Sequence, residues 1–242
     1  RFSMLRSIFD FATEKLDESE SKESVLYRHA QRYSQWSKRL PEFYRHGGDV
    51  LLQQLYEEAS NIRVAFQRSL EYGWTDVAAP LALTLAFITK MHGPVEEGVA
   101  VLESALNLEN VPERSRLDLQ ISLCKCSLSQ RPWKVVLKEI QQCYTLYSDV
   151  IVNRDVVELL IAESRIYAKL NKLNDVRGKI EQAIQLSQQN GFRHLYAESV
   201  ILRTQWHPQH PTAHMDLQSV IALMKQDGNL LQLGMAWFHF GQ

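Results

Sequence analysis

The sequence predicts an all-α fold, a stack of antiparallel helix pairs, and two spacing patterns and the composition support this prediction. Small residues recur in apolar helical stripes about every forty positions, separated by 38 and 40 residues: Ala105, Cys143 and Ala183. A second set precedes each of them by nineteen residues: Ala86, Cys124 and Ser164. Repeats of this length with helical spacing are typical of arrays in which every unit is a helix pair. Only 10 Gly and 7 Pro interrupt the 242 residues, which favours helix throughout.

The composition narrows the classes of function. Hydrophobic residues make up 45% of the chain, which is enough for a sizeable core. A formal net charge of −1 gives no argument for contact with nucleic acid or with a membrane surface. No apolar stretch approaches the ~18 residues of a membrane span. Three cysteines do not make an even disulfide framework, so we expect a reducing, cytoplasmic compartment.

Twelve helices are expected along the chain, from the 3.6-residue periodicity of apolar residues and from the turn residues between the apolar runs. Their ranges are 2–16, 22–45, 49–72, 75–92, 94–108, 113–130, 132–147, 153–170, 172–190, 192–206, 212–227 and 229–240. Turn residues follow eight of them, in order Gly47-Gly48, Gly73, Gly93-Pro94, Pro112, Arg131-Pro132, Asn190-Gly191, the stretch 208–211 and Gly228-Asn229. The acidic, serine-rich segment 17–24 is expected to be a solvated loop. Short loops make successive helices antiparallel neighbours.

The nineteen-residue spacing of small residues within each pair resembles the tetratricopeptide repeat, a helix-turn-helix unit of about 34 residues. Tyr167 and Gly93 occupy the aromatic and turn-glycine positions of that pattern. The copies here are longer, most of the large consensus residues are missing, and a fourth copy near 192–227 is only weakly in phase. The resemblance implies a right-handed α-α superhelix over residues 75–242, with the first helix of each pair on the concave face.

The first 106 residues carry a more specific resemblance. They contain four phrases in a fixed order: RFSMLRSIFDFA (1–12), RHAQRY (28–33), EEASNIRVAF (57–66) and GPVEEGVAVLESAL (93–106). Together these resemble the end of the winged-helix segment, and the helices after it, in STAND-class signal-transduction ATPases. The match departs from the family at Gln67, Thr89 and Met91, and it covers less than half of the chain.

The resemblance implies a bacterial transcriptional regulator of the antibiotic-regulator or maltose-regulator type. Residues 1–20 would be the tail of the winged-helix segment, 21–74 a long helical hairpin, and 75–242 the repeats that act as sensor. The partners would be the ATPase and DNA-binding modules of the same protein. The chain has no G-x-x-x-x-G-K-[ST] phosphate loop, so any ATPase chemistry would lie upstream. Because the first residue is Arg1 rather than Met, we expect a piece of a longer protein.

The concave face is the candidate binding site. We expect these positions to point inward: Leu83, Phe87, Lys90, Met91, Asp118, Ile121, Lys125, Leu128, Glu158, Ile161, Arg165, Ala168 and Lys169. Lys90, Lys125, Arg165 and Lys169 would form a basic stripe beside Phe87 and receive an anionic effector, such as a carboxylate-bearing peptide, a protein or a sugar phosphate. The alternative is an ordinary solvated polar face. No nucleophile–base–orienter set is visible, so we expect no enzyme and no cofactor. A free-standing protein-binding scaffold without switching is the competing function.

Two motifs suggest chemistry but have simpler explanations. His207, His210 and His214 resemble a metal cluster, yet zinc sites usually include Cys or carboxylate ligands, and two prolines make a polar connector the better reading. Cys124 and Cys126 resemble a redox pair, but a C-x-C spacing on a helix turns the two thiols ~200° apart. We therefore expect no metal site and no redox site.

Two aromatic groups complete the candidate list. The first is expected to form a core seam, with a docking face for a missing module as the alternative: Tyr33, Trp36, Phe43 and Tyr44. The second makes the last helix strongly apolar: Met235, Trp237, Phe238 and Phe240. If its partner helix is absent, that surface would be exposed and would favour a homo-oligomer.

Overall fold

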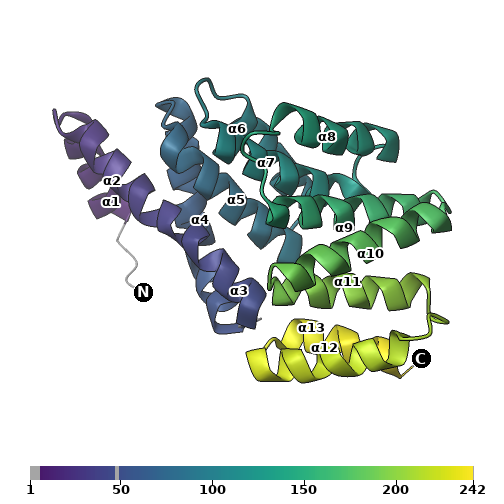
Figure 1. The fold of residues 1–242 in the computed structure, drawn as a ribbon. Coiled ribbons are helices and arrows are strands. Elements are labelled where there is room, and N and C mark those ends of the chain that lie inside the picture. The colour runs from purple at the N-terminus through teal and green to yellow at the C-terminus, as the bar shows by residue number, and fades with distance from the viewer. Residues whose placement is uncertain (1–5, 47–48, 242) are drawn as a thin grey trace.

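A computed structural model describes residues 6–46 and 49–241, and every regular element in this part of the chain is a helix (Figure 1). The all-α prediction is confirmed, and most helix ends fall within a few residues of their expected positions. Residues 2–5 of the first expected helix and the break at Gly47-Gly48 lie outside the described residues. The elements are α1 (Arg6–Asp17), α2 (Lys22–Ser34), the 3-10 helix η1 (Gln35–Arg39), α3 (Leu40–His46), α4 (Asp49–Glu71), α5 (Thr75–His92), α6 (Val95–Leu106), α7 (Glu113–Cys126), the 3-10 helix η2 (Ser127–Ser129), α8 (Trp133–Leu146), α9 (Asn153–Lys169), α10 (Leu173–Gln189), α11 (Arg193–Trp206), α12 (Ala213–Asp227) and α13 (Leu230–Phe240).

The prediction of one helix over residues 22–45 is wrong, because η1 separates α2 from α3. Pro41 explains the change of pitch: it has no N–H to donate to the carbonyl of Ser37, and its ring crowds that carbonyl. The Ser37 carbonyl accepts instead from the backbone N–H of Leu40. The expected loop 17–24 is also too long, because it shrinks to a turn over 18–21 between α1 and α2.

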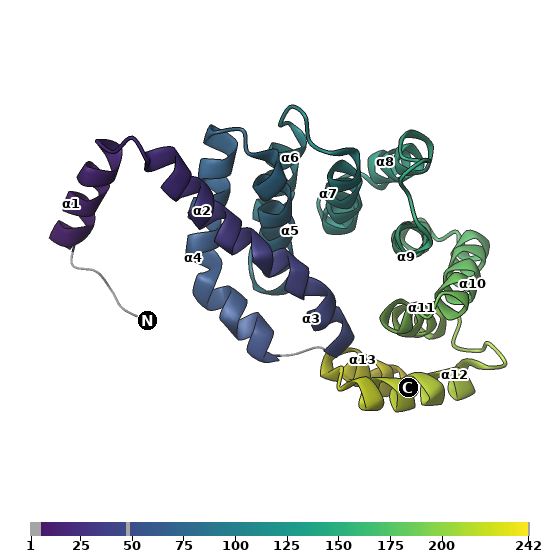
Figure 2. The same cartoon turned by 60° about the vertical axis from the view of Figure 1, so that its left-hand side comes forward.

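Successive helices follow one another around an arc (Figure 2). The first helices of the pairs lie along its inner side, where α5 contacts α7, α7 contacts α9, and α9 contacts α11. Their partners α6, α8, α10 and α12 lie outside them. The side chains that face the interior of the arc therefore come from α5, α7, α9 and α11, the helices on which the sequence placed the candidate binding residues.

The small residues of the repeat pattern lie where helices meet. All six are buried: Ala86, Ala105, Cys124, Cys143, Ser164 and Ala183. Helices α5 and α6 approach closely, because a Cβ on Gly98 would collide with Thr89 Oγ1 and stand 3.4 Å from Ala86 Cα. Because glycine has no Cβ, the two helices approach each other here more closely than a larger residue at this position would allow.

Helix α3 meets the last helices of the chain and closes the arc. Helix α3 contacts α11, and both views place it beside α13 (Figures 1 and 2). Asn229, the N-cap of α13, donates a hydrogen bond of 2.9 Å from Nδ2 to the backbone carbonyl of Tyr44. The ring of Tyr44 also stacks on His194 of α11, with centroids 6.0 Å apart. The interior of the arc is thus bounded by helices from both halves of the chain.

None of the helices in the described part of the chain combines the length and the apolarity that crossing a lipid bilayer requires.

Candidate ligand-binding groove

Three adjoining cavities open on the inner side of the arc, and we call them together the inner groove. Cavity A, of about 250 Å³, lies between η1, α3, α5, α7 and α9. Cavity B, of about 430 Å³, is lined mainly by α9, α11 and residues around η2. Cavity C, of about 190 Å³, lies between α3, α5, α11 and α13. The three cavities adjoin one another, because A and B share Lys125, and B and C share Arg165 and Met235.

All five residues proposed from the sequence line the inner groove. Phe87 and Lys90 face cavities A and C, while Lys169 faces cavity B. Lys125 and Arg165 stand at the shared walls. Of the other positions expected to point inward, Ile161 and Ala168 are instead buried in the apolar core between α9, α10 and α11, where burial of their side chains stabilises the packing.

Lys125 is paired with a carboxylate from the next inner helix. Its Nζ lies 2.7 Å from Glu158 Oε2, and Arg154 Nε approaches the other oxygen of Glu158 at 3.3 Å. Burial opposes the ionisation of Glu158, but the positive charge of Lys125 and its hydrogen bond lower the pKa of Glu158 to about 2. Burial acts in the same way on Lys125, yet the negative charge of Glu158 raises the pKa of that amine above its ordinary value. Both groups therefore carry their charge at neutral pH.

Arg165 repeats this arrangement one helix further along. Its Nη2 lies 2.7 Å from Glu198 Oε1. In both pairs the carboxylate follows the cation by 33 residues, so the cation of one inner helix meets the acid of the next. The expected basic stripe is consequently neutralised at two of its four positions. The 33-residue spacing between these charges is present in the sequence, but the paired side chains come into contact only because α7, α9 and α11 lie side by side.

Lys90 differs from these two cations. It makes no hydrogen bond or ion pair with the residues that the structure describes, and the residue 33 positions later is the buried, apolar Leu123. The Lys90 side chain is exposed and lines cavities A and C. Desolvation by the groove walls, together with the positive charge of Lys125, lowers the pKa of Lys90 below its ordinary value. Lys90 is thus a solvent-accessible cation of the groove without a partner in the described chain.

Aromatic rings form the wall beside Lys90. Phe87 packs edge-on against Phe43 and Tyr44, with centroid distances of 4.7 and 5.6 Å. The Nζ of Lys125 stands 5.9 Å from the Tyr44 ring. The expected core seam is confirmed, since Phe43 is buried and Tyr33, Trp36 and Tyr44 pack against the same cluster. The sequence did not indicate that Tyr44 also faces the groove.

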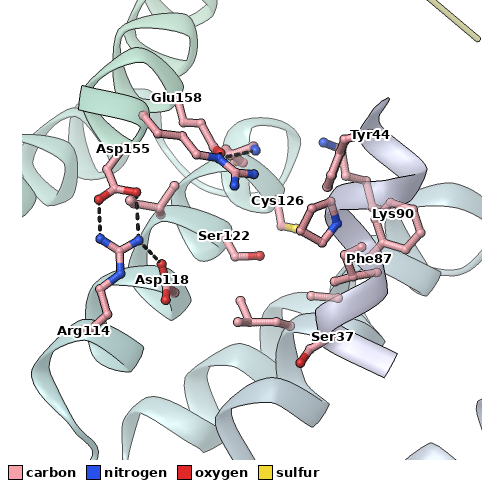
Figure 3. A pocket seen from close by; sticks show the side chains of 17 residues that line it. Ser37, Tyr44, Phe87, Lys90, Arg114, Asp118, Ser122, Cys126, Asp155 and Glu158 are labelled. Carbon is pink, nitrogen blue, oxygen red and sulfur yellow. Dashed lines mark hydrogen bonds and ion pairs between the residues drawn. The ribbon is translucent and has the colours of Figure 1, made fainter. Parts of the chain in front are cut away.

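The opposite end of cavity A is closed by a guanidinium and two carboxylates (Figure 3). Arg114 Nη2 donates to Asp118 Oδ1 at 2.5 Å and to Asp155 Oδ1 at 2.9 Å, and Nη1 bonds the other oxygen of Asp155. The side chain thereby joins α7 to α9. Figure 3 shows this cluster facing Tyr44, Phe87 and Lys90 across the cavity. Because Arg114 pairs with a carboxylate from each of two helices, the cluster acts as a structural anchor.

The histidines and cysteines take structural positions. His210 Nδ1 lies 3.0 Å from Thr212 Oγ1, whereas the ring of His214 packs on Phe240. Within residues 6–46 and 49–241, no three His, Cys, Asp or Glu side chains gather so as to hold a metal ion. Cys124 and Cys143 share one apolar cluster and Cys126 belongs to another, as expected from the C-x-C spacing.

The last helix leaves most of its apolar side chains uncovered. Trp237 and Phe238 are exposed, and only Ala236 of the helix is buried. Leu231 and Met235, at 48% and 40% exposure, form part of the wall of cavity C. The outer residues of α13 therefore match the expected exposed surface, and its inner residues belong to the groove.

No protein-family model matches the chain, and no curated protein is significantly similar to it. Its function therefore has to be inferred from the shape, the lining and the charges of the inner groove.

Proposed function

We propose that this chain is the non-catalytic sensor and interaction portion of a multidomain regulator, and that the inner groove binds its effector. One observation carries the proposal: the adjoining cavities are lined by residues from both halves of the chain. A ligand in cavity C would touch α3 and α5 on one side and α11 and α13 on the other. Its binding free energy would thus favour the closed arc over any arrangement in which these helices separate.

The proposed architecture is a right-handed superhelix of tetratricopeptide-like helix pairs. It is supported by the contacts of α5 with α6 and of α9 with α10, and by the succession of inner helices along the arc. The buried small residues at the pair interfaces support it as well. In such an array a small change at each interface adds up along the stack, which suits a sensor.

The proposed context is a STAND-class ATPase that controls transcription in the cytoplasm. Its support is the four sequence phrases within residues 1–106. In this context α1 would close the winged-helix segment, and the ATPase and DNA-binding modules would be the partners of the array. Effector binding would shift the population of array positions against the ATPase core, and only a ligand that binds one arrangement better would act.

The competing function is a protein-binding scaffold that does not switch. The exposed apolar residues of α13 favour it, because such a surface suits a stable protein contact or a second copy of the chain. A scaffold would bind its partner equally well in every nucleotide state of the full-length protein.

A substitution that fills part of the groove with a large side chain distinguishes the sensor from the scaffold. Ser122 lines cavity A and is half-buried, so Ser122→Trp would fill this cavity. Ser104 is equally half-buried but lies on the outer helix α6, away from the groove, and Ser104→Trp is the matched control. The protein is expressed with all the sequence that precedes Arg1 in its gene, and ATP and ADP affinities are measured by isothermal titration calorimetry.

The sensor proposal expects Ser122→Trp to change the ratio of ATP to ADP affinity at least threefold, and Ser104→Trp to leave it unchanged. An unchanged ratio in both variants would favour the scaffold. If the full-length protein contains no nucleotide-binding module, the regulatory part of the proposal is wrong.

A further inference from the structure

We propose that the inner groove selects a small carboxylic acid with an apolar body, its carboxylate paired with Lys90 and its body in cavity C. This inference rests on the proposed function, since it names the chemical class of the effector. An aromatic or branched aliphatic monocarboxylate has the required form.

The charge of the ligand follows from the pairing of the groove cations. Lys125 and Arg165 have their own carboxylates at 2.7 Å, whereas Lys90 has no partner among the described residues. An unpaired ammonium in the wall of a cavity, with other cations nearby, is stabilised by an anion that enters and pairs with it. Because Lys90 is unpaired among the described residues of cavity C, a ligand with a single negative charge complements this cavity. A dianion such as phosphate would bring excess negative charge close to Glu198, which lines the same cavity.

The apolar body follows from the walls of cavity C. Besides Lys90 and the Arg165–Glu198 pair, the cavity is lined largely by apolar side chains, including Phe87, Met91, Leu231 and Met235. Leu231 and Met235 remain about half exposed, so a ligand that covers them removes apolar surface from water.

The size of the ligand follows from the volume. A cavity of about 190 Å³ is smaller than the ~300–1,000 Å³ of sites for drug-sized molecules. A single ring or a short branched chain fits this volume better than a peptide or a sugar phosphate. The edge-on cluster of Phe43, Phe87 and Tyr44 is an aromatic wall against which an aromatic body can pack.

The test uses the 242-residue chain and four probes: 3-phenylpropionate, its neutral amide, acetate and inorganic phosphate. Binding is measured by calorimetry at pH 7. We expect 3-phenylpropionate to bind at least tenfold more tightly than its amide, acetate or phosphate. Equal binding of the acid and the amide would overturn the role of the carboxylate, and preferred binding of phosphate would overturn the ligand class.

Two pairs of variants locate the site. Lys90→Met should weaken 3-phenylpropionate binding at least tenfold, whereas Lys169→Met, which removes a cation of cavity B, should not change it. Leu231→Asn should weaken it several-fold, whereas Leu230→Asn should have no effect, because Leu230 is exposed and does not line cavity C. Thermal melting checks that each variant is folded.

Wild-type affinity in Lys90→Met would overturn the proposal, as would a failure of all four probes to bind. Neither result would decide the proposed function, because the nucleotide response to Ser122→Trp tests the groove without any knowledge of its ligand.

Discussion

The side-chain amide of Asn229 holds the backbone carbonyl of Tyr44 at 2.9 Å across 185 residues of sequence. The same side chain caps α13, because its Oδ1 accepts from the backbone N–H of Gln232 at 3.0 Å. One buried residue thus starts the last helix and ties it to α3, on the wall of the groove. The contact gives the closed arc a specific point at which its closure can be weakened.

Asn229→Ser should remove the hydrogen bond to the Tyr44 carbonyl and keep the N-cap of α13. Serine is a good N-cap, but its hydroxyl does not reach the Tyr44 carbonyl. The lost hydrogen bond and the unsatisfied carbonyl should lower the free energy of unfolding by about 1–3 kcal/mol. Hydrogen exchange should be faster in α3 and α13 and unchanged in α6 and α8. Unchanged exchange in α13 would show that this contact does not maintain the closure.

Glu158→Gln should destabilise the protein strongly near neutral pH. The change removes the partner of Lys125, and breaking a buried ion pair in this way costs about 3 kcal/mol. The pKa of Glu158 is about 2, below the ~4.3 of an unfolded glutamate, so its contribution is complete above pH ~5 and is lost as the pH falls toward 2. Urea unfolding at a series of pH values should show the difference between wild type and variant shrinking over this range.

The control for this prediction is Glu42→Gln. Glu42 faces Arg39 at 3.7 Å, and both side chains are exposed. Such a pair contributes about 0–1 kcal/mol, so the variant should remain close to wild type at every pH. A pH-independent loss in Glu158→Gln would indicate that lost packing, rather than the ion pair, explains its effect.

Lys90→Met should stabilise the chain in the absence of ligand. The pKa of Lys90 is lowered in the fold, so the charged amine is held at a cost at neutral pH. That cost disappears as the pH rises through the lowered pKa toward the ordinary value of ~10.4. Because the side chain is exposed and solvent screens its charge, the gain in thermal stability should be small; it should be present at pH 7 and should shrink toward pH 10. Lys169→Met should shift stability by less than about 0.5 kcal/mol, and a loss of stability in Lys90→Met would contradict the description of Lys90 as unpaired.

Gly98→Ala should destabilise the α5–α6 pair, because the added Cβ collides with Thr89 Oγ1. Overpacking of this kind costs about 1–3 kcal/mol. Thr89→Ala in the same chain should restore part of the loss, since it removes the colliding atom. Gly178→Ala in α10 is the control: its Cβ would meet open space, and the change should add about 0.5–1 kcal/mol of stability. Equal effects of the two glycine substitutions in chemical denaturation would refute the close approach.

Charge reversal of Lys125 and Arg165 together is a poor test of ligand binding. Each new carboxylate would face Glu158 or Glu198 at the short distance now spanned by an ion pair. Loss of binding in such a variant would reflect repulsion within the fold as much as repulsion of a ligand. Lys90 is the better position, because its replacement breaks no ion pair in the described chain.

The local pattern of the sequence determined the helices and much of the groove. Helical spacing and turn residues suffice to place most elements, because these signals depend only on neighbours along the chain. The recurring small residues identified where helices meet, and the helical phase brought Phe87, Lys90, Lys125, Arg165 and Lys169 to one face. The break at η1 also had a local cause in Pro41, although the periodicity concealed it.

Only the tertiary structure decided which groove cations are free and what closes the groove. Lys125 and Lys90 have the same local character, and they differ because α9 brings Glu158 to one of them, while the corresponding position of α7 is the apolar Leu123. The contact between Asn229 and Tyr44 depends on the accumulated curvature of all the helices between them. Ion pairing and closure are set by distances between helices, and a one-dimensional pattern does not contain these distances.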